Sequence, residues 1–279
     1  MGAARYPSYA LNNNAVLRSR QYYARIGGSS PDRIQMTRPK SLPAEDLEKL
    51  RAIDTCTVSN AIERLNVRLR NEGFVNGAAH CQFPDLGPMV GYAATGRIRT
   101  AAPPMTQRCY YDRMDWWTYV ASMPEPRIMV LQDADPMPGF GAFVGEIHAS
   151  IGHALNCIGC ITNGAARDLP AVEAMGFHLF AGCVAPSHSY AHIIEFGEPV
   201  EIGGLKIQSG DLLHGDRHGI VAVPLDAAAD VPAQAAAILR EERELRRYCD
   251  SAQFSLEGLG ERISNKGADC DEPWNSRRK

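Results

Sequence analysis

Strand-like and helix-like segments alternate through the middle of the chain, and this alternation limits the fold more than any other feature of the sequence. An apolar run of five to eight residues rich in β-branched side chains is typical of a buried strand, whereas a 3.6-residue apolar period is typical of a helix. Alternating segments of the two kinds are typical of an α/β domain. The predicted strands are Val90–Thr100, Arg127–Gln132, Cys157–Thr162 and His178–Val184, and the helices between them are Asp112–Met123, Ala142–Asn156 and Leu169–Met175.

Further elements flank this block on both sides. Gly203-Gly204 between two short apolar runs is a hairpin signature, and a second strand pair is expected around Asp216–Gly219. Residues 1–40 show no sustained apolar period, so they are expected to form an irregular N-terminal extension. We therefore predict one α/β domain over residues 41–255 and a flexible tail over residues 256–279. The remaining predicted helices are Ala44–Ile53, Thr57–Leu65 and Ala227–Tyr248.

Composition and charge exclude several classes of function. A formal net charge of -3 gives no basic face of the kind that nucleic-acid binding requires. No apolar run approaches the roughly 20 residues that cross a bilayer, and no secretory signal is visible. The eight cysteines are scattered rather than spaced as a disulfide framework. We expect a cytoplasmic protein that binds neither nucleic acid nor membrane.

Two stretches carry candidate chemistry. Gly145, with Glu146, Ile147 and His148 after it, lies near a predicted helix start, where glycine allows close approach and helix N–H groups bind carboxylates. A glycine that only relieves crowding explains the same pattern. Asn163–Asp168 directly follows a predicted strand, and strand ends in α/β sheets gather ligands.

The adjacent pair Arg167 and Asp168 offers what a 2-oxo acid needs. A guanidinium binds a carboxylate through two parallel hydrogen bonds, and an aspartate binds a hard cation such as Mg²⁺. The alternative interpretation is a surface arginine followed by an aspartate that caps the helix Leu169–Met175. Spacing alone favours this alternative.

An ordered set of motifs resembles the family that contains the regulator of ribonuclease activity A and the 4-hydroxy-4-methyl-2-oxoglutarate aldolases. The resemblance covers most of residues 45–255. The motifs are Leu50–Ala61, Glu146, Asn163–Asp168, Met175–Ala181, Gly197–Ile207, Gly210-Asp211-Leu212 and Asp216–Pro224. It implies a swivelling β/β/α fold of the RraA-like type, here with an N-terminal extension and a C-terminal helix. It also implies trimers or hexamers with sites between subunits.

The resemblance further implies roles for individual residues. The backbone amides of Ile147 and His148, after Gly145, would hold the substrate carboxylate. Arg167 would contact the pyruvoyl part and Asp168 would ligate Mg²⁺ or Mn²⁺, with Glu146 near the metal through water. A glutamate of the C-terminal helix, Glu242 or its neighbour Glu241, would reach the metal of a neighbouring subunit.

Three features depart from the family pattern. Asn163 and Asn60 stand where the family usually has aspartate. An insertion over Pro103–Trp117 adds aromatic residues, which we expect near the site entrance, although Trp116 and Trp117 more often belong to a core or an interface. Arg167 and Asp168 are retained, so the reaction class is better supported than the substrate.

The resulting hypothesis is a metal-dependent carbon–carbon lyase that cleaves a 4-hydroxy-2-oxo acid to pyruvate, with oxaloacetate decarboxylation as a side activity. The alternative is a non-catalytic regulator that binds a ribonuclease or helicase. The pairs His188/His192 and His214/His218 lack the motif of a helical zinc site, and Cys157/Cys160 has no second pair at zinc-ribbon distance. His188 or His192 is still placed to line the substrate pocket.

Overall fold

The computed structural model describes residues 41–104 and 113–267. The chain divides into two compact units, Met1–Thr37 and Arg38–Lys279. The first unit, and with it the predicted irregular extension over residues 1–40, lies outside the described residues, as does most of the aromatic insertion. The second unit contains the predicted α/β domain.

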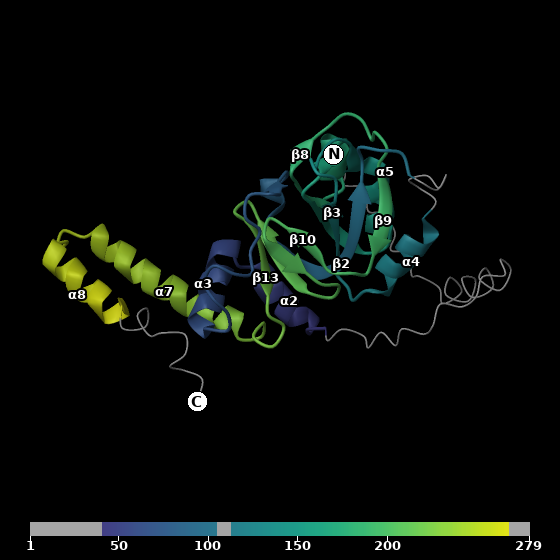
Figure 1. Ribbon diagram of the computed structural model, residues 1–279. Helices are drawn as coiled ribbons and strands as arrows, with labels where there is room; N and C mark the ends of the chain where they lie inside the picture. The colour runs from purple at the N-terminus through teal and green to yellow at the C-terminus, as the bar shows by residue number, and fades with distance from the viewer. Residues whose placement is uncertain (1–40, 105–112, 268–279) are drawn as a thin grey trace, which may run out of the picture. The chain divides into compact units, whose positions relative to one another are not determined.

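An eight-stranded mixed sheet forms the centre of this unit (Figure 1). Its middle is parallel: β2 (Met89–Arg99), β3 (Arg127–Asp133), β5 (Cys157–Thr162) and β7 (His178–Ala181) lie side by side in that order. Their apolar residues are buried, as expected for parallel strands covered on both faces. Antiparallel strands complete the sheet: β1 (His80–Cys81), β9 (His192–Phe196), β12 (Leu212–Asp216) and β13 (Gly219–Val223).

Strand β2 is long enough to change partners along its length. Its first half, Met89–Tyr92, pairs with β12, and its second half, Gly96–Arg99, pairs with β9. β12 and β9 thus pair with the same edge of β2. The sheet curls toward a nearly closed barrel (Figure 1). The hairpin of β10 (Val200–Ile202) and β11 (Leu205–Ile207) packs its apolar side chains into the core against β3, as predicted around Gly203-Gly204.

Three strands of the large sheet each continue into a strand of a smaller parallel sheet. β3, β5 and β7 are followed by β4 (Ala142–Val144), β6 (Ala165–Ala166) and β8 (Cys183–Val184), which pair in the order β4-β6-β8. The chain bends between the two parts. At the bend before β8, a Cβ on Gly182 would lie 2.3 Å from the carbonyl oxygen of Asn163, so this approach requires glycine.

The helices cover the two sheets in separate groups. After β4 and β6 come α5 (Glu146–Ala154) and α6 (Leu169–Ala174), and α4 (Met114–Ser122) packs over the end of β2. On the other side, α2 (Ala44–Arg51), α3 (Thr55–Leu65) and the start of α7 (Val231–Cys249) bury a second apolar cluster. A short 3₁₀ helix spans Pro84–Leu86. No helix of the described ranges is both long enough and apolar enough to span a membrane.

The structure corrects several sequence predictions. The helix predicted over Ala142–Asn156 is a strand and a shorter helix, divided at Gly145. The strand predicted over His178–Val184 is two strands in different sheets, divided at Gly182. Strand β9 was not predicted. The expected flexible tail begins with a helix, α8 (Leu256–Gly267), and residues 268–279 lie outside the described part.

Candidate active site at the edge of the small sheet

The predicted site residues meet at the carboxyl edge of the small sheet. Because β4 and β6 are parallel neighbours, the residues that follow them emerge side by side. Gly145 follows β4 and precedes α5, and Arg167-Asp168 follows β6 and precedes α6. The amide of Arg167 donates to the carbonyl oxygen of Val144 at 2.9 Å, which holds the two junctions together. The structure therefore brings Gly145 together with Arg167 and Asp168.

Gly145 contacts the acidic and basic side chains directly. A Cβ at this position would lie 2.6 Å from Asp168 Oδ2 and 2.9 Å from Arg167 Cγ. Its φ of -154° is extended backbone that any residue adopts, so conformation does not demand glycine here. The glycine is required because a side chain would fill the space that Arg167 and Asp168 occupy.

Asp168 receives two hydrogen bonds on one oxygen. Oδ2 accepts from Arg167 Nε and from the backbone amide of Glu146, each at 3.2 Å. The two side chains remain accessible, with exposed fractions of 27% for Arg167 and 36% for Asp168. Asp168 also has a φ of 55°, an uncommon left-handed conformation for a residue with a side chain, and such outliers gather at functional sites. One face of the carboxylate is therefore fixed while the other is open to a ligand.

The first turn of α5 presents backbone donors beside this pair. In an α-helix the first N–H groups have no partner within the helix, and the helix dipole favours an anion there. Ile147 is 51% exposed, whereas the side chain of His148 is buried. The centroid of the His148 ring lies 4.6 Å from the ring centroid of Phe143 and 5.6 Å from that of Trp117. Burial, with smaller effects of His188 and Arg167, lowers the pKa of His148 to about 3, so its imidazole is neutral.

His188 lies within electrostatic reach of Arg167 and Asp168. Burial and the charge of Arg167 lower its pKa, and the charge of Asp168 opposes them. His188 belongs to the segment after β8, the third strand of the small sheet, so all three strands contribute to this edge. His192 instead belongs to β9.

The remaining predictions are partly changed by the structure. Glu241 forms a two-pronged ion pair with Arg64 of α3, at 2.9 and 2.7 Å, within the same chain, whereas Glu242 is exposed. Trp116 and Trp117 are buried in the core, so these two residues form no site entrance. Among residues 41–104 and 113–267 no three His, Cys, Asp or Glu side chains form a group that could hold a metal.

A cavity of about 500 Å³ lies at a different edge, where β2, β3 and β5 of the large sheet end. Its lining includes Arg97, Arg99 and Asp133, but neither Arg167 nor Asp168. Sequence reasoning did not single out this cavity. The signal that was available is the pair of arginines two residues apart at the end of a predicted strand.

The fold and this edge together define a mixed α/β protein with a glycine, an arginine and an aspartate at a helix N-terminus. The chain belongs to the RraA-like family: the family model described as Aldolase/RraA matches residues 55–222.

Individual relatives are distant. A putative 4-hydroxy-4-methyl-2-oxoglutarate aldolase of Halalkalibacterium halodurans is 30% identical over 84 residues, which span 30% of this chain and 40% of that relative. Among solved structures, an uncharacterized protein of Pseudomonas syringae has a TM-score of 0.63 and 22% identity, covering 85% of this chain and 99% of that chain. Streptomyces coelicolor RraAS2, described as an unusual member of the RNase ES inhibitor RraA family, has a TM-score of 0.58 and 19% identity, covering 74% and 98%. The predicted RraA-like fold is confirmed by these structures.

Proposed function

We propose that this protein is a divalent-metal-dependent carbon–carbon lyase that cleaves a 4-hydroxy-2-oxo acid and releases pyruvate. The observation that carries the proposal is the contact of Arg167 and Asp168 with Gly145 at the first turn of α5. The relative named as a putative 4-hydroxy-4-methyl-2-oxoglutarate aldolase supports this reaction class, although the match covers 40% of its length.

The substrate carboxylate binds between α5 and Arg167. The amides of Ile147 and His148 lie in the first turn of α5, where N–H groups are available to an anion. Arg167 adds a charged donor from the neighbouring strand end, and its guanidinium suits a planar carboxylate. The ring of His148, which burial keeps neutral, packs behind this turn.

The donor set at this edge suits a hard cation. Asp168 and Glu146 both have exposed side chains and offer only oxygen ligands, and Mg²⁺ typically takes one or two protein carboxylates together with waters and substrate oxygens. Asp168 would hold Mg²⁺ or Mn²⁺ directly, Glu146 through water, and Glu242 of the partner subunit would approach from the other side. The bound cation supplies Lewis acidity where negative charge develops on the 2-oxo group.

Bond cleavage then follows the ordinary retro-aldol balance. The C4 hydroxyl loses its proton to a water at the open face, the C3–C4 electron pair moves toward the 2-oxo carbon, and the second product leaves as a carbonyl compound. Protonation of the resulting enolate at C3 gives pyruvate. Arg167 keeps the C1 carboxylate in place throughout. Oxaloacetate loses CO₂ to give the same enolate without needing a base, so its decarboxylation is the expected side activity.

A homotrimer or homohexamer fits the surface around this edge. Three apolar side chains here are exposed: Phe140 before β4 (62%), Ile147 of α5 (51%) and Val184 of β8 (55%). Apolar side chains gathered beside a polar site are typical of an interface. A second subunit covering them would also bring its own Glu242 toward Asp168.

The second candidate is a regulator that binds a ribonuclease or helicase, because the solved RraAS2 structure of the same fold is described as belonging to an RNase ES inhibitor family. The resemblance to the family implies that its regulators end soon after the final strands, so a long helix after the last strand supports the lyase. Here that helix is α7, with 19 residues.

Pyruvate release from 4-hydroxy-4-methyl-2-oxoglutarate and from oxaloacetate, measured with Mg²⁺ and with a chelator, tests the proposal. We expect activity with Mg²⁺ and its loss in Arg167→Ala and Asp168→Ala. Arg217 and Asp85 form another exposed Arg–Asp pair, at 3.3 Å, and Arg217→Ala and Asp85→Ala serve as matched controls with wild-type turnover. Equal turnover with and without chelator contradicts the metal dependence, and inhibition of a ribonuclease in the absence of any turnover contradicts the lyase.

A further inference from the structure

The cavity at the carboxyl ends of β2, β3 and β5 is a second place where a ligand could bind. In α/β folds ligands bind outside the carboxyl ends of parallel strands, and this cavity occupies that position on the large sheet. Its volume of about 500 Å³ is that of a small-molecule site. From Asn163, at this cavity, to Arg167 the chain runs along β6, so the cavity and the candidate active site lie at opposite ends of the small sheet.

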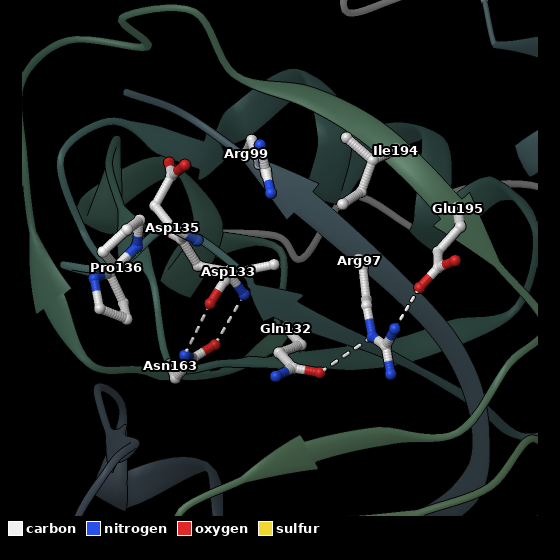
Figure 2. A pocket seen from close by; sticks show the side chains of 11 residues that line it. Arg97, Arg99, Gln132, Asp133, Asp135, Pro136, Asn163, Ile194 and Glu195 are labelled. Carbon is white, nitrogen blue, oxygen red and sulfur yellow. Dashed lines mark hydrogen bonds and ion pairs between the residues drawn. The ribbon is translucent and has the colours of Figure 1, made fainter. Parts of the chain in front are cut away.

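Two arginines of β2 line the cavity from one side. Arg97 and Arg99 flank Ile98, which is buried, and side chains alternate along a strand, so both arginines project away from the core. Arg97 Nε donates to Gln132 Oε1 at 3.2 Å, and Nη1 pairs with Glu195 (Figure 2). Nη2 donates to the carbonyl oxygen of Pro199 at 2.8 Å, so all three side-chain nitrogens of Arg97 have partners. Arg99 is exposed, and within the described ranges it has no hydrogen-bond partner. Arg99 is therefore the cation that can bind a ligand.

The aspartates of the cavity are already satisfied by backbone donors. Asp133 accepts from the amides of Gly139 at 2.8 Å and Asp135 at 3.1 Å. Asp135 Oδ2 accepts from the amides of Thr100 at 2.6 Å and Ala101 at 2.8 Å. Burial raises the pKa of the Asp135 carboxyl, but these hydrogen bonds and the charge of Arg99 outweigh it, so its pKa lies below the usual value. Both aspartates thus hold the loop through hydrogen bonds with backbone amides.

Two further groups remain available to a ligand. Gln132 Oε1 accepts from Arg97 and from the amide of Glu201, which leaves the Gln132 NH₂ group as a donor. Glu195 uses Oε1 for Arg97, which leaves Oε2 as an acceptor on a side chain that is 40% exposed. The available set is thus one guanidinium, one amide donor and one carboxylate acceptor. A compact inorganic anion suits this set poorly, because it brings no donor for Glu195.

We propose that this cavity binds a small polyhydroxylated carboxylic acid, such as an aldonic acid, whose carboxylate pairs with Arg99 and whose hydroxyl groups hydrogen-bond Gln132 and Glu195. The guanidinium of Arg99 gives the carboxylate a two-pronged partner. The hydroxyl groups, which both donate and accept, match an amide donor beside a carboxylate acceptor. The binding needs no metal and does not involve Arg167 or Asp168, so it stands apart from the proposed lyase activity.

Calorimetric titration of the full chain with D-gluconate tests this site. Two matched ligands separate its parts: D-glucitol has the same carbon chain without the carboxylate, and hexanoate has the carboxylate without the hydroxyl groups. We expect D-gluconate to bind with a Kd of about 1 mM or lower, and each matched ligand to bind at least about tenfold more weakly, as expected for the loss of one charged or two neutral hydrogen bonds.

Variants locate the binding. Arg99→Ala should raise the Kd for D-gluconate about tenfold or more, and Arg99→Lys should give an intermediate value because it keeps the charge without the fork. Arg243→Ala removes an exposed arginine of α7 and should keep the wild-type Kd, as should Arg167→Ala. Absence of D-gluconate binding in the wild type, an unchanged Kd in Arg99→Ala, or loss of binding in Arg167→Ala would each overturn the proposal.

Discussion

Gly145 and Asp168, which are 23 residues apart in the chain, are separated by so little space that a single methyl group on Gly145 would lie 2.6 Å from the carboxylate oxygen Oδ2. That oxygen also accepts from the amide of Glu146, so the glycine fixes how the aspartate meets the helix N-terminus. The contact ties the conformation of the candidate metal ligand to one backbone position.

Gly145→Ala should therefore lower pyruvate release strongly while leaving the fold intact. The new methyl group pushes Asp168 and Arg167 aside, and a displacement of about 1 Å at a reacting centre costs on the order of 100-fold in rate. The measurement is kcat/KM with saturating Mg²⁺, together with a thermal melt. Gly260→Ala is the control, because a Cβ there meets nothing within 4 Å. Wild-type kcat/KM in Gly145→Ala would show that the reacting groups lie elsewhere.

Much of the large sheet could be predicted from the sequence. β5 is a continuous apolar run. Nearly all residues of β2 and β3 are buried, so these strands are mostly apolar in sequence and their boundaries can be read from composition. The residues Arg167 and Asp168 could also be named, because they retain the family motif.

The small sheet could not be predicted, for a physical reason. Its strands are two or three residues long, and a run such as Ala142–Val144 before Gly145 has no period that distinguishes strand from helix. Only pairing with β6 makes it a strand. Strand β9 escaped prediction because Ile193 and Ile194 are adjacent apolar residues although one is buried and the other is exposed, so the apolar pattern of the sequence does not alternate.

The Asn163 side chain explains one departure from the family pattern and gives a second prediction. Its Oδ1 accepts from the amide of Asp133 at 2.7 Å, and its Nδ2 donates to the carbonyl oxygen of Asp133 at 3.1 Å (Figure 2). An aspartate cannot make both bonds, because it has no donor when ionised. Asn163→Asp should lower the free energy of unfolding by about 1–3 kcal/mol.

Urea denaturation at pH 7 measures this change. Asn71→Asp adds the same charge at an exposed position and should stay within about 0.5 kcal/mol of the wild type. If the two variants unfold at the same urea concentration, the two-bond contact between Asn163 and Asp133 contributes nothing to stability.

Arg127 joins the ends of two helices and gives a third prediction. Its guanidinium donates to the carbonyl oxygens of Ala121, in the last turn of α4, at 2.8 Å and of Met123, directly after α4, at 2.9 Å. It also donates to the carbonyl oxygen of Leu155, directly after α5. The side chain is 9% exposed, so these carbonyls lose their partners without gaining water when the arginine is removed. Arg127→Met should cost about 2–4 kcal/mol of stability.

Thermal and urea unfolding of Arg127→Met test this role, with Arg243→Met as the exposed control. Since Arg127 lies at the opposite end of α5 from Gly145, any folded fraction should keep its affinity for Mg²⁺. A loss of stability below about 1 kcal/mol would mean that water replaces the guanidinium at these carbonyls.

The buried ring of His148 predicts a loss of stability in acid. Its pKa of about 3 in the folded protein lies below the usual value of about 6.5 in the unfolded chain, so the unfolded state binds the proton first. The stabilisation is complete above about pH 6.5 and is lost as the pH falls toward 3. At pH 5 this group alone should lower the free energy of unfolding by about 2 kcal/mol relative to pH 8.

His148→Phe keeps a ring against Phe143 and Trp117 but cannot titrate. Its free energy of unfolding should therefore fall by about 2 kcal/mol less than that of the wild type between pH 8 and pH 5. His80→Gln, which changes an exposed histidine, is the matched control. Comparing the change with pH, rather than the stability at one pH, removes any packing cost of the larger ring. Parallel curves for His148→Phe and the wild type would mean that the imidazole is protonated equally in the folded and unfolded states, and so that the ring behind the first turn of α5 is accessible to water.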